Sequence, residues 1–152
     1  MNILAELQAG VITASAEETR ALAARLAITL PPDITLALHG DLGVGKTTFV
    51  QGLAQGFGLP GAVTSPTFNI LHLYRPPVHA GSGQGARTLA HLDAYRLENA
   101  HQVAELMLDD ILVSPYCLAV EWPERIAAWL PPDALHLTLA IDGPGQHHVT
   151  LA

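Results

Sequence analysis

Short apolar runs alternate with helix-like stretches along the chain, and this alternation predicts the order of its secondary structure. Runs rich in apolar or β-branched residues, which predict strands, occupy residues 34–39, 67–74, 88–92, 117–122, 135–141 and 147–151. The runs at 34–39 and 117–122 are almost continuously apolar, as expected of strands that are covered on both faces. A turn signal at 142–145 (Asp-Gly-Pro-Gly) separates the last two runs and predicts a C-terminal hairpin.

The stretches between these runs predict helices. Residues 15–18 (Ser-Ala-Glu-Glu) have the spacing of a capping box, in which the serine and the glutamate satisfy each other's backbone amides. Pro31 and Pro32 end this first helix, because proline cannot donate a backbone hydrogen bond. Further helices are predicted over residues 46–57, 100–112 and 123–130. Strands that alternate with helices predict a single α/β domain over residues 1–152, with a mostly parallel central sheet flanked by helices.

The charge balance narrows the range of functions that this domain can have. Of its 152 residues, 14 are acidic and 7 are basic, which gives a formal net charge of -7 with histidine neutral. Charged residues make up 14% of the chain, against about 25% in ordinary soluble domains. Binding to a nucleic-acid backbone needs clustered lysine and arginine, so we expect no direct binding of DNA or RNA over a broad face.

Other features predict a soluble, cytoplasmic protein. No run of about 18 apolar residues is present to span a membrane. The N-terminal residues lack the basic segment that opens a secretory signal. The single cysteine, Cys117, cannot form an internal disulfide, which fits a reducing compartment. Its apolar neighbours indicate a buried strand cysteine rather than a nucleophile.

Residues 40–47 (Gly-Asp-Leu-Gly-Val-Gly-Lys-Thr) match the phosphate-loop (Walker A) pattern G-x-x-x-x-G-K-[ST] at every fixed position. Its glycines allow backbone angles that side chains forbid, so that successive amides can converge on an anion at the start of the next helix. Lys46, the only lysine of the chain, would reach the β- and γ-phosphates, and the Thr47 hydroxyl would be a ligand of Mg²⁺. The alternative is a glycine-rich turn with a chance lysine, which does not explain the second glycine, the Lys-Thr pair and the strand-loop-helix order together.

A phosphate-loop enzyme also needs a carboxylate near the end of a neighbouring strand, to hold Mg²⁺ directly or through water. Asp93 follows the apolar run at 88–92, and Glu121 follows four apolar residues of the run at 117–122. Both lie where open α/β sheets place ligand chemistry, at the carboxyl ends of strands. The alternative is that each is an exposed acid capping the next helix.

Four segments occur in the order found in one known family. They are residues 40–49, Ser65-Pro66-Thr67-Phe68, His91-Leu92-Asp93-Ala94-Tyr95-Arg96 and Glu121-Trp122-Pro123-Glu124. Together they resemble the bacterial TsaE (YjeE) family, the small ATPases of tRNA threonylcarbamoyladenosine (t6A) biosynthesis. The resemblance covers residues 15 to 132, and the last three segments in series are far more specific than the phosphate loop alone.

The resemblance implies a P-loop NTPase fold that binds ATP and Mg²⁺. Residues implied to contact the nucleotide are Asp41, Leu42, Gly43, Val44, Gly45, Lys46, Thr47 and Thr48, with Thr19 near the base and Trp122 near the nucleotide. Thr47, Asp93 and Glu121 would hold the metal, and Lys46 would act in catalysis with the two acids. For Trp122 the alternative is an aromatic residue that packs at a helix start. The segments around 64–68 and 91–96 would act as nucleotide-sensing switches.

From the residues alone, the roles within the 91–96 segment stay open. His91 would orient a water molecule or a partner residue, or would only be a satisfied polar group. Arg96 would stabilise transferred phosphate charge, or would only form an exposed ion pair. Ser65-Pro66-Thr67 is also an ordinary turn before a strand.

The chain departs from the family pattern at three places. The segment from 76 to 86 is longer than the family usually carries, and Leu106-Met107 stands where the family usually has Leu-Gly. Gly145-Gln146-His147-His148 stands where the family often has an arginine after a glycine, so the resemblance does not extend to a contact made by that arginine.

The function expected from these observations is an ATPase that supports the machinery modifying tRNA to t6A. The resemblance implies partners of the TsaD and TsaB families, which would carry out the threonylcarbamoyl transfer while hydrolysis resets or paces the complex. Two other functions remain open: a small-molecule kinase, and a binding module that needs ATP for docking but not its hydrolysis. The arginines are scattered along the sequence, without the arginine-bearing lid that small kinases usually have.

Overall fold

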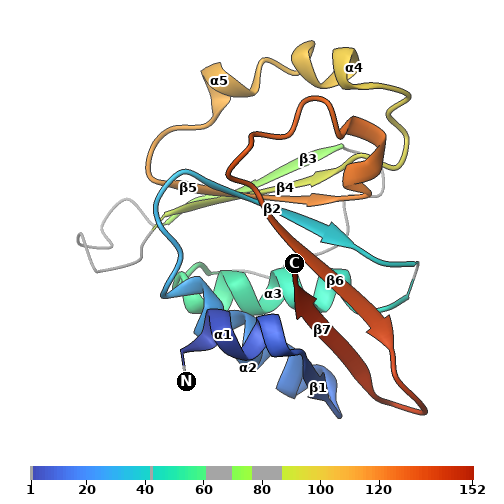
Figure 1. Cartoon of the computed structure of the whole chain (residues 1–152). Coiled ribbons are helices and arrows are strands. Elements are labelled where there is room, and N and C mark those ends of the chain that lie inside the picture. The colour runs from blue at the N-terminus through green and yellow to red at the C-terminus, as the bar shows by residue number, and fades with distance from the viewer. Residues whose placement is uncertain (1, 42, 61–69, 77–86) are drawn as a thin grey trace.

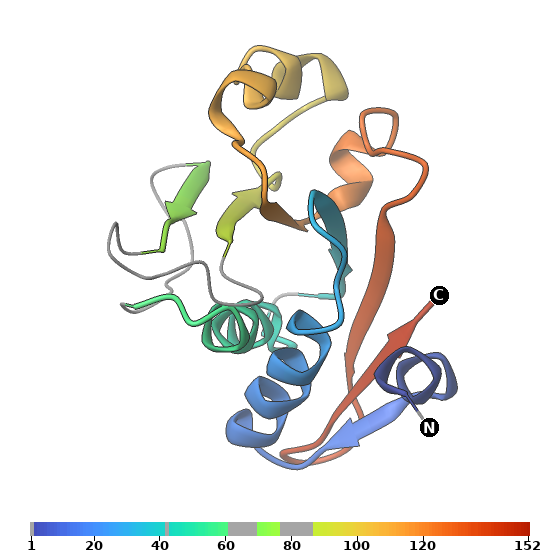
Figure 2. The same cartoon turned by 90° about the vertical axis from the view of Figure 1, so that its left-hand side faces the viewer.

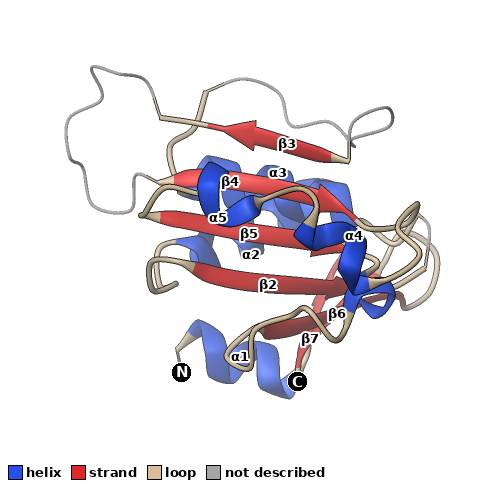
Figure 3. Ribbon diagram, turned by 90° about the horizontal axis from the view of Figure 1, so that it is seen from above, coloured by secondary structure: helices blue, strands red, loops and turns tan. Residues whose placement is uncertain are grey.

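The computed structural model describes residues 2–41, 43–60, 70–76 and 87–152. Within these residues, seven strands form one sheet in the order β1-β7-β6-β2-β5-β4-β3. The strands are β1 (Val11–Thr13), β2 (Ile34–His39), β3 (Leu71–Tyr74), β4 (Thr88–Asp93), β5 (Tyr116–Glu121), β6 (Leu135–Ile141) and β7 (His147–Leu151). Figure 3 shows β3, β4, β5 and β2 side by side, seen from above.

The centre of the sheet is parallel and its edges are antiparallel. β6, β2, β5 and β4 run parallel to one another, whereas β1 pairs antiparallel with β7, β7 with β6, and β3 with β4. The predicted parallel centre and C-terminal hairpin are therefore confirmed. The strand predicted at 67–74 begins at Leu71, and residues 67–69 lie outside the described part of the chain.

Helices cover both faces of the sheet (Figure 1). On one face lie α1 (Ile3–Ala9), α2 (Ala16–Ala27) and α3 (Lys46–Gly56), and on the other lie α4 (Ala100–Ala104), α5 (Leu108–Ile111) and the 3₁₀ helix η1 (Pro123–Ile126). Two hydrophobic cores result, one on each side of the sheet. Successive residues of β4 and β5 alternate between these cores, which explains why both strands are apolar almost throughout.

The N-terminal part of the chain was not predicted in full. The sequence pattern gave no expectation for α1 or β1, because elements of seven and three residues are too short for periodicity to be read. Figure 2 shows β1 (blue) and the β6–β7 hairpin (red) continuing the sheet beside α1 and α2. The capping box of α2 is confirmed in part: the Ser15 hydroxyl accepts from the Glu18 amide, but the Glu18 carboxylate accepts from Ala14 rather than from Ser15.

α2 and α3 pack closely because two glycines of α3, Gly52 and Gly56, leave room for the neighbouring backbone. A Cβ atom placed on Gly52 of α3 would lie 2.3 Å from the carbonyl oxygen of Arg20 in α2. α3 therefore lies directly against α2, and the loop that precedes α3 leads into the N-terminal end of this packed helix. Cys117 of β5 is fully buried in the same core, and burial raises the pKa of its thiol to about 12. The prediction of a buried strand cysteine is therefore confirmed.

The single helix predicted over residues 100–112 is wrong. Two short helices, α4 and α5, replace it, and the chain changes direction at Met107, which has a left-handed backbone (φ 54°). Val103 and Leu108 are both buried in the same core. In one continuous helix, residues five apart would point roughly 140° away from each other, so the break allows both side chains to be buried.

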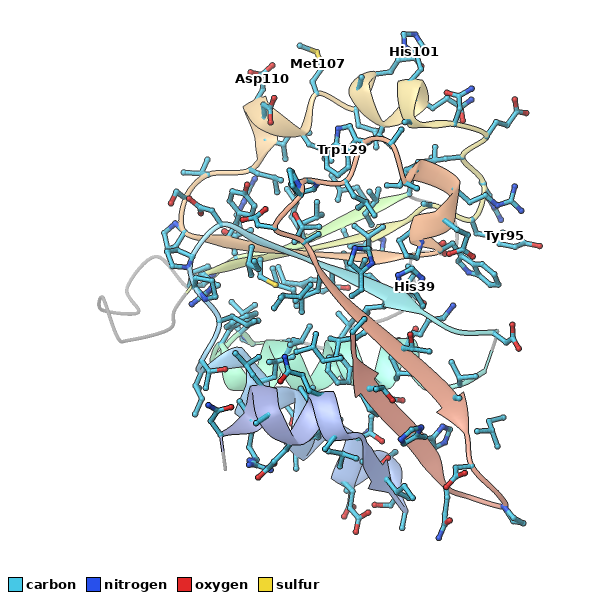
Figure 4. The ribbon with its side chains drawn as sticks, in the orientation of Figure 1. His39, Tyr95, His101, Met107, Asp110 and Trp129 are labelled. Atoms are coloured by element: carbon cyan, nitrogen blue, oxygen red, sulfur yellow. The ribbon has the colours of Figure 1, made fainter. Side chains whose placement is uncertain are left out.

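The break places Met107 in a strained, left-handed backbone conformation. We therefore expect Met107→Gly to stabilise the protein. A non-glycine residue in the left-handed region costs on the order of 1–3 kcal/mol, whereas glycine adopts it freely. Met107 is 61% exposed and projects away from the sheet, as does Asp110 on α5 (Figure 4), so little buried apolar surface is lost. After the larger unfolded-state entropy of glycine is deducted, we expect a gain of about 1 kcal/mol in the free energy of unfolding.

Chemical denaturation of the purified protein measures this gain. Met107→Ala is the matched control, because it also removes the side chain but keeps the strained backbone. A Met107→Gly variant no more stable than Met107→Ala would show that the backbone at this position stores no strain.

The helix predicted over residues 123–130 is also wrong in part. Only the 3₁₀ helix η1 forms, and later backbone bonds again join residues three apart, as from Trp129 to Ile126. Pro123 and Ile126 are both buried, and a three-residue turn places them on one side. No helix in the described part of the chain is both long and apolar enough to cross a membrane.

Candidate functional site

The loop between β2 and α3 has the shape that its glycines predict. Gly40, Gly43 and Gly45 have φ values of 141°, 82° and 98°, a region that side chains disfavour. Gly40 is also needed for space, since a Cβ atom there would lie 2.4 Å from the carbonyl oxygen of Leu139 on β6. α3 begins directly after Gly45, so the strand-loop-helix order expected from the motif is present.

A pocket of about 290 Å³ opens over this loop and the ends of β5, which lies beside β2, and of β4, the next strand in the sheet. Its lining residues are Gly43, Gly45, Lys46, Thr47, Thr48, Asp93, Glu121 and Trp122. They come from three parts of the chain that are far apart in sequence: the loop with the start of α3, the end of β4, and the end of β5. The fold therefore brings most of the predicted site residues to one place.

Lys46 carries the positive charge of this pocket. Its side chain is buried, and its Nζ donates a hydrogen bond of 2.7 Å to the carbonyl oxygen of Gly40. The same Nζ lies 4.1 Å from the centre of the Trp122 ring. Within the described residues no carboxylate forms an ion pair with this ammonium group. A buried cation without a paired anion favours an anionic ligand beside it.

Two carboxylates stand opposite the loop at the ends of neighbouring parallel strands. Asp93 of β4 and Glu121 of β5 are partners in the strand register. The Asp93 Oδ1 accepts a hydrogen bond of 3.0 Å from the Tyr95 amide, and the Glu121 Oε2 lies 2.6 Å from the Nε2 of His91. The alternative of two exposed helix-capping acids does not hold for Glu121, because it is 5% exposed.

The donors that face the pocket are oxygen atoms of the kind that Mg²⁺ prefers. They are the hydroxyls of Thr47 and Thr48 and the carboxylates of Asp93 and Glu121, and such a small oxygen set fits an ion that keeps several of its waters. The described residues contain no group of three or more His, Cys, Asp and Glu side chains that could hold a metal ion. The set therefore suits an ion that is held jointly by the protein and a bound phosphate, rather than a closed protein cage.

Other residues predicted for the site lie elsewhere or are not described. Asp41 is exposed, and it lines a separate hollow along β6 together with Val44, whose side chain is buried in the core. Thr19 is buried in α2, where its hydroxyl lies 2.7 Å from that of Thr13. Thr19 does not line the pocket over the loop. Leu42 and the segment 64–68 lie outside the described residues, as does most of the 76–86 segment.

The structure also brings histidines to the loop that sequence reasoning did not single out. His39 ends β2, and its Nε2 lies 2.8 Å from the Nδ1 of His136 on β6. Burial and the neighbouring His136 hold the pKa of His39 below its usual value. His147 of β7 lies beside Gly45 with its Nδ1 buried and without a partner in the described residues. The sequence carries no signal for these contacts, because they depend on the order of the strands in the sheet.

No arginine lines the pocket among the described residues. Arg87 is buried and donates to the carbonyl oxygens of Leu30 and Pro31. Arg125 lies over the ring of Tyr95, at 5.6 Å from its centre. Arg96 is exposed.

Comparisons with known proteins agree with these observations. A protein-family model described as "Threonylcarbamoyl adenosine biosynthesis protein TsaE" matches residues 13–148. A Bacillus subtilis protein named "tRNA threonylcarbamoyladenosine biosynthesis protein TsaE" is 36% identical over 138 residues, which cover 91% of this chain and 81% of that protein. A Streptomyces coelicolor protein of the same name is 41% identical over 120 residues, covering 79% of this chain and 77% of that protein.

A solved structure shows the same fold. The crystal structure of Bacillus subtilis YdiB superposes with a TM-score of 0.72 at 32% sequence identity, covering 93% of this chain and 82% of that one. This match, the family model and the relatives all extend over most of the chain. The chain therefore belongs to the TsaE family of threonylcarbamoyl adenosine biosynthesis proteins.

Proposed function

We propose that this protein binds and hydrolyses Mg·ATP in support of the modification of tRNA to N6-threonylcarbamoyladenosine at position 37 (t6A37). The observation that carries the proposal is the buried Lys46 ammonium, which forms no ion pair with the described residues and shares its pocket with a glycine-rich loop and two strand-end carboxylates. Phosphates would pair with the Lys46 ammonium, and the two carboxylates would then need a cation between themselves and those phosphates.

The residues of the pocket have distinct tasks in this proposal. The loop amides and the N-terminus of α3 bind the phosphate oxygens, and Lys46 exchanges its bond with Gly40 for the β- and γ-phosphates. Thr47, Asp93 and Glu121 would hold Mg²⁺, which, when bound, neutralises charge that develops on the phosphates. The Trp122 ring covers the side of Lys46 and limits its access to water.

Analysis of the reaction products tests the proposal against a kinase. Incubation of the protein with Mg·ATP, alone and with a cell metabolite extract, is expected to give ADP and inorganic phosphate in equal amounts. A phosphorylated metabolite formed in place of free phosphate would instead establish the small-molecule kinase. The lack of arginine in the described pocket disfavours that function, because kinases use arginines to hold the transferred group.

The second alternative is a binding module that needs ATP only for docking. A non-hydrolysable ATP analogue that supports repeated rounds of t6A formation would favour that module over an ATPase. In our proposal the analogue supports docking but not continued turnover, because hydrolysis resets the complex.

Partners of the TsaD and TsaB families are part of the proposal, and we place the reaction in the cytoplasm. The net charge of -7 disfavours a broad contact with the tRNA backbone. We therefore assign the handling of tRNA to the partner proteins rather than to this chain.

A further inference from the structure

We propose that His91 is a positioning residue that fixes one oxygen of the Glu121 carboxylate and leaves the other free to face a cation in the pocket. The inference rests on the proposed function, because it concerns the metal end of the same pocket. It assigns a task to the one fully buried histidine among the residues that the structure describes.

The first step is the geometry of the two strands. Asp93 and Glu121 are register partners, and His91 lies two residues before Asp93 on β4. Residues two apart on a strand point to the same face, so His91 shares its face with the register pair at the pocket. The register partner of His91 is Ala119, whose small side chain leaves room for the imidazole to reach along β5 to Glu121, at 2.6 Å.

The second step is the direction of the hydrogen bond. An ionised carboxylate only accepts hydrogen bonds, so the Nε2 of His91 must carry the proton and donate to the Glu121 Oε2. The other ring nitrogen is Nδ1. That atom is buried and has no partner in the described residues. The histidine therefore makes one polar contact with its side chain, and that contact is with Glu121.

The cost of this arrangement indicates that the contact has a purpose. His91 is 0% exposed and stands between Ala90 and Leu92, in a strand whose other inner positions are apolar. Leaving a buried polar atom unpaired is unfavourable, and an apolar residue at this position would avoid that penalty. An apolar side chain would satisfy the packing at this position, but only a hydrogen-bond donor can hold the Glu121 carboxylate.

The third step is the free oxygen. Within the described residues the Oε1 of Glu121 has no hydrogen-bond partner, and it is not among the buried atoms that lack one, so it keeps accessible surface. Glu121 lines the pocket, so Oε1 is the oxygen that a ligand there can reach. A carboxylate held by one oxygen keeps the other in one place, and such outer contacts typically change metal affinity or activity by 10- to 100-fold.

The experiment compares three replacements of His91 in the full-length protein. His91→Gln carries an amide N–H near the position of Nε2, His91→Asn carries it near Nδ1, too short to reach Glu121, and His91→Leu carries none. Calorimetric titration with a non-hydrolysable ATP analogue, at a series of Mg²⁺ concentrations, measures the Mg²⁺ concentration needed for half-maximal binding. We expect a rise of about tenfold for His91→Asn and His91→Leu, and a change below about twofold for His91→Gln.

Two controls separate positioning from a structural role. Binding of the analogue in EDTA should not change in any variant, because the loop and Lys46 are untouched. In a Glu121→Gln background, His91→Leu should add little to the Mg²⁺ requirement, because the group that it positions is already altered. A structural role would instead lower binding in EDTA as well, and would add its effect in both backgrounds.

Each outcome decides the inference. It is overturned if His91→Asn performs as well as His91→Gln, if all three variants match the unmodified protein, or if the effects add in the Glu121→Gln background. Should His91→Leu fail to fold, the comparison of Gln with Asn still decides, since both are polar and close in size. If the unmodified protein binds the analogue equally well with and without Mg²⁺, the proposed metal site fails and the inference fails with it.

Discussion

Replacing Lys46 with alanine is expected to abolish ATP binding and hydrolysis while leaving the fold intact. The ammonium group is buried, bonded to the Gly40 carbonyl oxygen and stacked on Trp122, and it is the only cationic side chain that lines the pocket among the described residues. Removing one preorganised group that stabilises transition-state charge typically lowers turnover by about 10²–10³. The loss of turnover in Lys46→Ala should reach at least that size, because Lys46 is proposed to bind the phosphates before the reaction as well as in the transition state.

The measurement combines calorimetric ATP binding, phosphate release and circular dichroism on the Lys46→Ala variant. Arg25→Ala serves as the control: Arg25 is on the surface, in an ion pair with Glu6, and its loss should not change ATP turnover. Lys46→Arg should also lose most activity, since a planar guanidinium is not a like-for-like replacement for a compact ammonium. Full ATPase activity in Lys46→Ala would refute the site.

A second large effect is expected from the partner proteins. Alone, the protein should turn over ATP slowly. The described part of its pocket contains no arginine, and its only carboxylates are the two that are proposed to hold the metal, so no general base is left for the attacking water. An arginine finger supplied by a partner is worth roughly 10³–10⁵ in turnover. We therefore expect a large increase in turnover when proteins of the TsaD and TsaB families are added, with the size set by which groups they supply.

Steady-state phosphate release with and without the partner complex measures this effect. A partner preparation mixed with the Lys46→Ala variant controls for ATPase activity that belongs to the partners. Equal rates with and without partners would contradict the expectation and would mean that this chain contains its full catalytic apparatus.

The centre of the site could be predicted from the sequence because local rules determine it. Phosphate-loop glycines and the apolar strand before them specify the strand-loop-helix unit. Asp93 and Glu121 could be placed together because parallel strands that neighbour each other end at the same edge of a sheet. The structure also shows that the two acids are register partners on adjacent strands. This pairing depends on the strand order, which could not be predicted from the sequence.

What could not be predicted depends on contacts between distant segments. The helix break at Met107 follows from the need to bury both Val103 and Leu108, and the family resemblance gave only a hint, a glycine at that position. The contact between His91 and Glu121 needs the register of β4 against β5. Thr19 was placed near the base by resemblance, whereas its hydroxyl contacts Thr13 in the structure, so its role stays a prediction.

The most direct test of Mg·ATP binding in this pocket is a crystal structure of the protein with Mg²⁺ and a non-hydrolysable ATP analogue. We predict that the γ-phosphate lies beside the Nζ of Lys46, with the metal bound by the Thr47 hydroxyl and contacted by Asp93 and Glu121, directly or through water. A triphosphate bound outside the pocket, or a metal that neither acid contacts, would contradict the account.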